Sequence, residues 1–227
     1  DYRRDQAMFR RSAKVKEKRT ATAVWLRIGE VEGLRQQCAT FDKGVFEAAL
    51  AEIRKLTVEP PKVFRPRLES LCAEAGVAVV FVPQFSGMGV SGVTRWLSDE
   101  RALIQLSLRY KTDDQLWFTF FHEAAHVLLH GRGDVFVEGA GYEDQKQKEE
   151  AEANQFAADF LIPPESWATF LATGDLNSFS GIRAFAESVG ISAGVVIGRL
   201  HYERRKPFNW GHPLKRKFQW TEKSKKR

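Results

Sequence analysis

The pattern His122-Glu123-Ala124-Ala125-His126 constrains this chain more than any other feature of its sequence. A spacing of four residues on a helix brings both imidazoles to one face, close enough to hold one Zn²⁺. Glu123 lies beside that face, where it can accept a proton from a water that the metal has made acidic. A buried helix with two hydrogen-bonded histidines is the purely structural alternative.

A helix around this pattern is predicted from other residues. Thr112-Asp113-Asp114-Gln115 fits the capping-box pattern, and Gly131 suits the end of a helix. The apolar face of the segment consists of Leu116, Phe120, Val127 and Leu128. The two histidines are therefore expected on a helix that packs inside the domain.

Two histidines do not complete a metal site, so the identity of the third ligand matters. His130 continues the row, but on an unbroken helix it lies about 12 Å along the axis from His122. That distance is too long for a shared metal. A metzincin site would need a glycine and a histidine where this chain has Leu129 and Arg132, which excludes that class.

The helix predicted over 149–161 offers three carboxylates. We expect Glu152 at the edge of its core stripe, Glu149 in solvent and Glu150 facing away. His122, His126 and Glu152 would then leave a fourth position open, which is typical of catalytic zinc. An ordinary surface charge is the alternative for Glu152. The core stripe consists of Ala153, Phe156, Ala157, Phe160 and Leu161.

The remaining periodicity predicts an α+β fold, with a small sheet packed on the motif helix and helical parts before and after it. The expected strands are 77–82, 90–97 and 102–108, and 134–137 is a further candidate. The expected helices are two within 20–56 and others near 66–75, 164–172, 180–189 and 192–205. The predicted divisions are a basic N-terminal segment with a helical linker region (1–61), the metallopeptidase core (62–175), a small helical part resembling a helix-turn-helix (176–206) and a basic tail (207–227).

The net charge of +6 is unevenly distributed. Residues 1–20 carry eight Lys or Arg against three Asp or Glu, and residues 199–227 carry eleven against two, so the body between them is acidic. The basic ends suggest either contact with DNA or solvated tails, including Lys215-Arg216-Lys217. The two cysteines lack a CxxC pattern and exclude a disulfide framework, and no apolar stretch is long enough to span a bilayer. A cytoplasmic location is expected.

Three further segments support the interpretation of His122-Glu123-Ala124-Ala125-His126 as a zinc site. Phe118-Thr119-Phe120-Phe121 precedes it, Glu152-Ala153-Asn154-Gln155-Phe156-Ala157-Ala158 follows, and Leu161-Ile162-Pro163 ends the next helix. Over roughly 62–205 the chain resembles the ImmA/IrrE metallopeptidases. The resemblance implies zinc, with the Glu before Ala-Asn, here Glu152, as the third ligand. It also implies a bacterial or phage protein that cleaves helix-turn-helix repressors or acts as an antitoxin-like regulator.

Two terminal segments carry weaker resemblances. Residues 1–56 resemble the segment that joins an XRE/HigA-type DNA-binding domain to the peptidase, and we expect that an upstream part was removed before Asp1. Residues 185–201 resemble the turn of a helix-turn-helix, in which Arg199 and His201 would face DNA. Ordinary packing of a helical bundle is the alternative for that segment.

The sequence thus predicts a zinc-dependent metallo-endopeptidase whose partner is a helix-turn-helix repressor or a toxin. Glu123 is the expected catalytic base, and the 102–108 strand is expected at a sheet edge, where it could pair with an extended substrate. Tyr142 and Arg109 are candidates for stabilising the oxyanion by residue type alone. The alternative is a non-catalytic antitoxin or transcription regulator that binds a toxin or DNA through a zinc-containing fold. Oligomeric state is not predicted.

Overall fold

The computed structural model describes residues 20–86, 88–130 and 142–220. The predicted strand at 134–137 and the basic run at 223–227 lie outside these residues. After a helix described over residues 20–35, the elements are α2 (Lys43–Lys55), η1 (Leu56–Val58), α3 (Pro61–Glu74), β1 (Val77–Phe81), β2 (Gly92–Ser98), β3 (Arg101–Leu106), α4 (Asp113–Leu129), α5 (Tyr142–Leu161), α6 (Pro164–Thr173), α7 (Phe179–Ser188), α8 (Ala193–Tyr202) and η2 (His212–Leu214).

The predicted α+β class is confirmed, with one small mixed sheet in the order β1-β3-β2. β3 pairs in parallel with β1 and antiparallel with β2. This order corrects the expectation that the strand over 102–108 forms a sheet edge. β3 lies in the centre, because it forms backbone hydrogen bonds with a strand on each side, and β2 lies at an edge of the sheet formed by the described residues.

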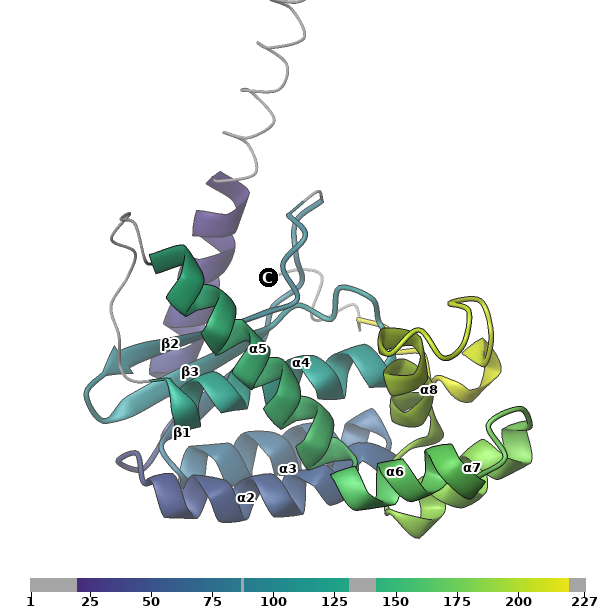
Figure 1. Cartoon of the computed structure of the whole chain (residues 1–227). Helices are drawn as coiled ribbons and strands as arrows, with labels where there is room; N and C mark the ends of the chain where they lie inside the picture. Colours follow the sequence, from purple (N-terminus) through teal and green to yellow (C-terminus); the bar gives the residue numbers. More distant parts are fainter. Residues whose placement is uncertain (1–19, 87, 131–141, 221–227) are drawn as a thin grey trace, which may run out of the picture.

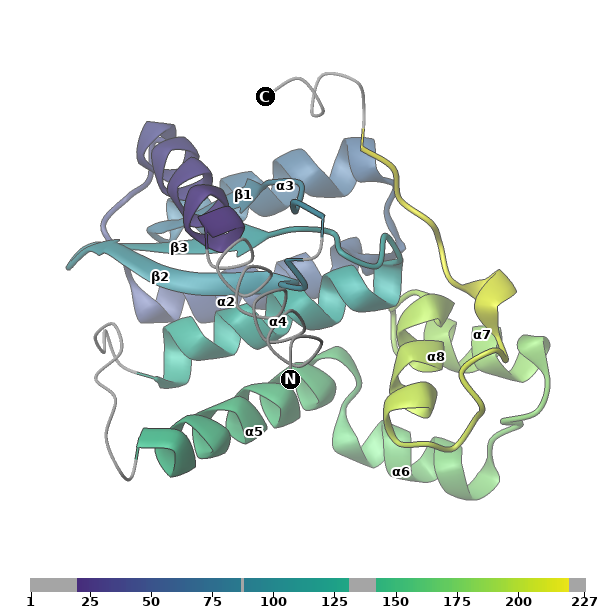
Figure 2. The same cartoon turned by 90° about the horizontal axis from the view of Figure 1, so that it is seen from above.

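The two faces of the sheet are covered by different helices. One face packs against α2, α3 and α4, and the helix at 20–35 crosses the other (Figures 1 and 2). That N-terminal helix is anchored by Trp25, which is fully buried and donates from Nε1 to the carbonyl of Val82 at 2.9 Å. Gln105 Nε2 in turn donates to the carbonyl of Trp25. Strands covered on both sides explain the unbroken apolar run of β1.

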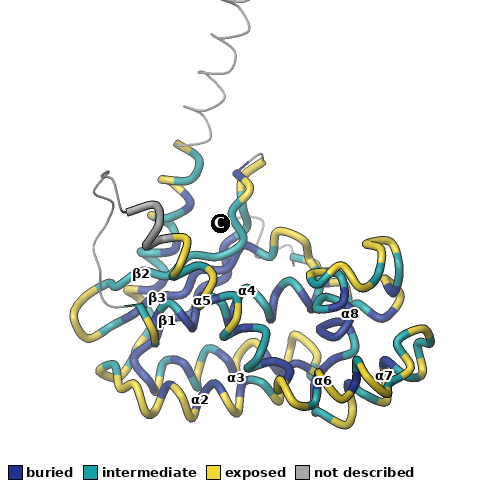
Figure 3. Tube along the Cα trace, in the orientation of Figure 1, coloured by how far each residue is buried: buried dark blue, intermediate teal, exposed yellow. Residues whose placement is uncertain are grey.

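The largest core cluster runs from α2 to the C-terminal segment without interruption. Phe64 of α3 meets Trp117 of α4 edge to face, with ring centroids 5.1 Å apart, and Phe121 stacks on Phe160 of α5 at the same distance. Figure 3 shows the buried positions gathered between the sheet and the helices. The predicted divisions after residues 61 and 175 remain predictions. Side chains on both sides of each division contribute to this one core cluster.

Two helices are longer than the sequence indicates. α3 begins at Pro61 rather than near Pro66, because a proline at the first helical position fits the fixed φ of its ring and needs no N–H partner. α5 begins at Tyr142 rather than near Glu149. The start of α4 follows Thr112 as expected, although the Thr112 side chain makes no capping hydrogen bond.

The C-terminal segment is anchored to the start of α4. Lys215 Nζ lies 2.6 Å from Asp114 Oδ2, and both side chains are buried. The backbone N–H of Arg216 donates to Asp113 Oδ1, and its guanidinium reaches the carbonyls of residues 57–59. Lys215 and Arg216 therefore belong to the fold, which corrects the expectation for these two residues, whereas Lys217 is exposed.

In the helix pair that resembles a helix-turn-helix, the residues expected to face DNA also make contacts inside the fold. Arg199 of α8 donates to the carbonyls of Ala158 and Ile162 and lies over the ring of Trp167. His201 Nε2 lies 2.8 Å from the carbonyl oxygen of Trp210. These contacts favour packing for the 185–201 segment.

Within the described residues, no single helix is both long and apolar enough to cross a membrane. The pair α7 and α8 reaches that threshold only when taken together, and it bends by 109° between the two helices.

Candidate metal centre

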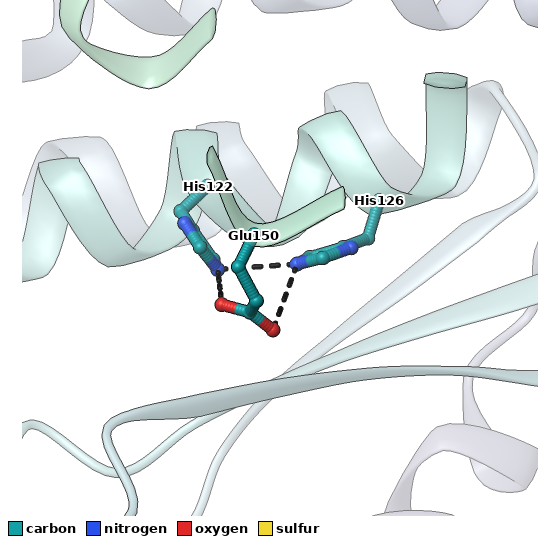
Figure 4. Close-up of side chains that lie close together, drawn as sticks. All are labelled: His122, His126 and Glu150. Atoms are coloured by element: carbon teal, nitrogen blue, oxygen red, sulfur yellow. Dashed lines mark hydrogen bonds and ion pairs between the residues drawn. The ribbon is translucent and has the colours of Figure 1, made fainter. Parts of the chain in front are cut away.

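α4 and α5 pack side by side and bring three potential metal ligands together (Figure 4). Nε2 of His122 lies 3.1 Å from Nε2 of His126, and both nitrogens face the carboxylate of Glu150 at 3.3 and 3.8 Å. One ligand atom from each residue falls within 4.8 Å of the others. Two imidazoles and one carboxylate converge on one point.

The third member of this group is Glu150, which corrects the prediction that Glu150 faces away, and Glu152, the predicted third ligand, lies outside the group. The physical reason is the phase of α5. Glu150 lies three residues before Ala153 and seven before Ala157, so it continues the stripe of α5 that faces α4. Both alanines are fully buried. Glu152 is two positions further round the helix and points elsewhere.

Glu152 is near the site but contacts a different histidine. Its Oε2 lies 3.1 Å from Nε2 of His130, and its Oε1 lies 3.7 Å from Nζ of Lys148. His130 has left helical geometry, with φ −106° and ψ 120°, so it does not follow the straight row that the sequence suggested. Its Nδ1 lies 2.8 Å from Nδ1 of His126.

A residue of the family pattern orients the first histidine. Asn154 Oδ1 lies 3.0 Å from Nδ1 of His122. A hydrogen bond at Nδ1 fixes the ring and leaves Nε2 free to bind a metal. The signal for this contact was present in the sequence, since Glu150 and Asn154 are four residues apart and share one face of α5.

Both imidazoles of the group are neutral near pH 7. Burial, together with the neighbouring His122 and His130, lowers the pKa of His126 to about 4. Burial also lowers the pKa of His122, against the opposing effect of Glu150. A neutral imidazole has a free lone pair, so both rings can act as ligands without first losing a proton.

Glu123 is held at the edge of the site by β2. Its side chain is buried, and burial raises its pKa to about 8, against the opposing hydrogen bond from Thr94. Thr94 Oγ1 lies 2.8 Å from Glu123 Oε2. Gly92 leaves no room for a side chain, because a Cβ there would lie 2.8 Å from Glu123 Oε1. A cation beside Glu123 would favour its charged form.

The donor set fits a metal ion, and zinc in particular. Two imidazole nitrogens and one carboxylate oxygen form the ligand set of catalytic zinc, and three protein ligands leave a position for a water or substrate. His122, His126 and Glu150 would hold the ion, while Glu123 stands beside it without belonging to the group.

A groove of about 720 Å³ adjoins the site between α5 and α8. Glu150 and Asn154 line its α5 side, and Arg199 and Tyr202 line its α8 side. Phe118 connects the groove to the site, because its ring centroid lies 6.3 Å from that of His122 and 6.0 Å from that of Tyr202. A ligand in this groove would therefore contact the metal-binding group directly.

The two candidates for oxyanion stabilisation have different outcomes. Arg109 donates to the carbonyl of Gly89 at 2.7 Å and lies over the ring of Tyr110, so its guanidinium already has partners. The side chain of Tyr142 lies outside the described residues. Sequence reasoning missed Thr94, whose position beside Glu123 depends on the register of β2 on β3 and has no local signal.

Comparison with known proteins agrees with this geometry. The family model of the IrrE N-terminal-like domain, Peptidase_M78, matches residues 72–201, which is more than half of the chain. The chain belongs to this family and carries a metallopeptidase-type domain. The resemblance to ImmA/IrrE proteins is thereby confirmed. No curated protein matches the chain.

Proposed function

We propose that this protein is a zinc-dependent metallo-endopeptidase of the ImmA/IrrE type that cleaves a partner protein. The observation that carries the proposal is the convergence of His122, His126 and Glu150 with a buried carboxylate, Glu123, at the edge of the group. A site that only stabilised the fold would need a fourth protein ligand and no adjacent base.

Each residue then has a defined part in peptide hydrolysis. Zinc bound by the three ligands would polarise the peptide carbonyl and acidify the attacking water. Glu123 takes a proton from that water and passes it to the leaving amine. Thr94 holds the Glu123 carboxylate in place, because its hydroxyl oxygen lies 2.8 Å from Oε2 and 2.8 Å from the backbone carbonyl oxygen of the same residue.

The surroundings of Glu123 suggest how a substrate would bind. Among the strands that the structure describes, β2 lies at a sheet edge, and it passes directly against Glu123 through Gly92 and Thr94. An extended substrate segment can add to such an edge through backbone hydrogen bonds. Its side chains on one side of the scissile bond would then enter the groove lined by Asn154 and Tyr202.

We further propose a helix-turn-helix repressor or a toxin as the partner and the cytoplasm as the compartment. An unfolded or extended segment of the partner is the form that an edge strand accepts. The free thiols of Cys38 and Cys72 accord with a reducing compartment. DNA contact would involve the basic N-terminal segment and the basic residues from Lys217 onward, since Lys215 and Arg216 are engaged inside the fold.

The test is cleavage by the wild type beside Glu123→Gln. Both forms are loaded with zinc and incubated with a peptide library made from digested bacterial proteins, and new peptide termini are read by mass spectrometry. Both are also co-expressed with the repressor or toxin of the neighbouring gene, and that partner is followed on gels.

We expect new termini and partner cleavage with the wild type alone, because an amide at position 123 cannot accept the proton. A partner that stays intact with both forms, while both neutralise the toxin or repress equally, would contradict the peptidase and favour the non-catalytic regulator.

A further inference from the structure

A hydrogen-bonded chain of three side chains, His126, His130 and Glu152, runs outward from the metal-binding group on the side away from Glu150. Nδ1 of His126 lies 2.8 Å from Nδ1 of His130, and Nε2 of His130 lies 3.1 Å from Oε2 of Glu152. The chain begins at a nitrogen of one proposed ligand and ends at a carboxylate whose side chain is 45% exposed.

The positions of the protons along this chain follow from the ligand role of His126. If Nε2 of His126 keeps a lone pair for the metal, the ring carries its proton on Nδ1 and donates it toward His130. Nδ1 of His130 must then accept, so His130 carries its proton on Nε2. That proton faces Glu152, which only accepts when it is ionised. One set of tautomers satisfies both hydrogen bonds at once.

The break at the end of α4 makes this arrangement possible. His130 caps the helix in an extended conformation, and its N–H donates to the carbonyl of His126 at 3.3 Å. Its ring therefore lies beside that of His126, with centroids 4.8 Å apart, and only a tenth of its side chain is exposed. A solvated histidine at a helix end would not be so placed.

The other proposed ligand has a shorter equivalent. Nδ1 of His122 meets Asn154 directly, whereas Nδ1 of His126 reaches Glu152 through His130. Both end groups come from α5, which also supplies Glu150. α5 thus provides one ligand and the outer partner of each of the other two.

We propose that His130 and Glu152 are positioning residues that fix the tautomer and ring orientation of His126 and so raise the affinity of the site for zinc. The inference rests on the metal site of the proposed function, but it does not need the protein to cleave peptides. Groups that hold a ligating histidine in this way typically change metal affinity by about 10- to 100-fold when removed.

The experiment is a competitive zinc titration of the full chain against a chromophoric chelator. The variants are His130→Ala, Glu152→Ala and the double variant, with Glu187→Gln as the control. That control removes one exposed carboxylate charge from α7 and leaves the His130–Glu152 hydrogen bond in place. Melting curves of the metal-free variants show that each is folded.

We expect each single variant to weaken zinc binding by about 10- to 100-fold. The double variant should be no weaker than His130→Ala, because Glu152 acts only through His130. Two conservative variants should recover part of the affinity. Glu152→Gln keeps an acceptor for His130, and the side-chain oxygen of His130→Asn can accept from His126.

The visible absorption of the Co²⁺-substituted protein separates positioning from ligation. Glu152→Ala should leave the ligand-field bands in place, whereas Glu150→Ala should change them. Unchanged zinc affinity in folded His130→Ala and Glu152→Ala, or additive losses in the double variant, would overturn the proposal. A band change with Glu152→Ala and none with Glu150→Ala would also overturn it and make Glu152 a ligand. Absence of peptide cleavage would count against the proposed function alone.

Discussion

The hydroxyl of Thr94 donates to the carboxylate of Glu123 across 2.8 Å, from an edge strand to the helix that carries the two histidines. This hydrogen bond opposes the effect of burial, which raises the pKa of Glu123 to about 8. The same hydroxyl lies 2.8 Å from the backbone carbonyl of Glu123, so the contact also fixes where the side chain starts.

Thr94→Val should therefore shift the pH dependence of cleavage. Loss of the hydrogen bond raises the pKa of Glu123 further, and a base must be deprotonated to act. The acid limb of kcat/KM should move to higher pH, with a loss of about 10- to 100-fold at neutral pH. Thr94→Ser keeps the hydroxyl and should retain the wild-type profile. Equal profiles for the valine and serine variants would show that the hydrogen bond does not tune Glu123.

Acid should destabilise the metal-free protein through its partly buried histidines. The pKa of His126 falls from 6.5 in the unfolded chain to about 4 in the fold. The unfolded state therefore binds a proton first, and stability present above pH 6.5 is lost as the pH falls toward 4. Melting temperatures in the presence of a chelator should drop across this window. His126→Gln should show a shallower drop, and a drop as steep as that of the wild type would exclude His126 as its source.

Much of the α4 motif was predictable because its signals are local. The spacing of His122 and His126, the polar residues at 112–115 and the apolar face all lie within one helix. The third member of the group was harder to predict, because several apolar residues of α5 could define the inner face of that helix. When the large Phe156 and Phe160 are counted in the core stripe, the predicted inner face lies nearer to Glu152. In the structure the small Ala153 and Ala157 are fully buried, and they share a face of α5 with Glu150.

The remaining features depend on residues far apart in the chain. Thr94 and Glu123 meet only once the sheet has formed, and the acidic partners of Lys215 and Arg216 lie about a hundred residues earlier. A run of basic residues reads as a tail when its acidic partners are not adjacent in sequence. Asp113 and Asp114 supplied a helix-start signal but gave no sign of being buried.

Removal of the Lys215 charge should strongly destabilise the fold. Lys215→Met leaves Asp114 buried without its ion-pair partner, since the two side chains are 7% and 2% exposed. Breaking a buried pair in this way costs about 3–5 kcal/mol of unfolding free energy. Urea unfolding measures the change. Lys217→Met, at an exposed position in the same segment, should change it by less than about 0.5 kcal/mol. Similar effects of the two variants would contradict the anchoring role.

A substitution at the close approach of α8 to the start of α4 should also destabilise the fold. A Cβ on Gly194 would overlap the Asp113 carboxylate, which cannot move away because Ser192 and Arg216 hold it. Gly194→Ala should cost about 1–3 kcal/mol by overpacking. Gly44→Ala in α2 meets only ordinary contacts and should be neutral or slightly stabilising. A neutral Gly194→Ala would mean that α8 does not lie this close to α4.

The central claim is that His122, His126 and Glu150 hold one zinc ion. The most direct measurement is an anomalous difference map recorded at the zinc absorption edge from crystals of the zinc-loaded protein. We predict one peak per chain, about 2 Å from Nε2 of both histidines and from a carboxylate oxygen of Glu150. A peak bound instead by Glu152 and His130, or no peak between α4 and α5, would contradict the account.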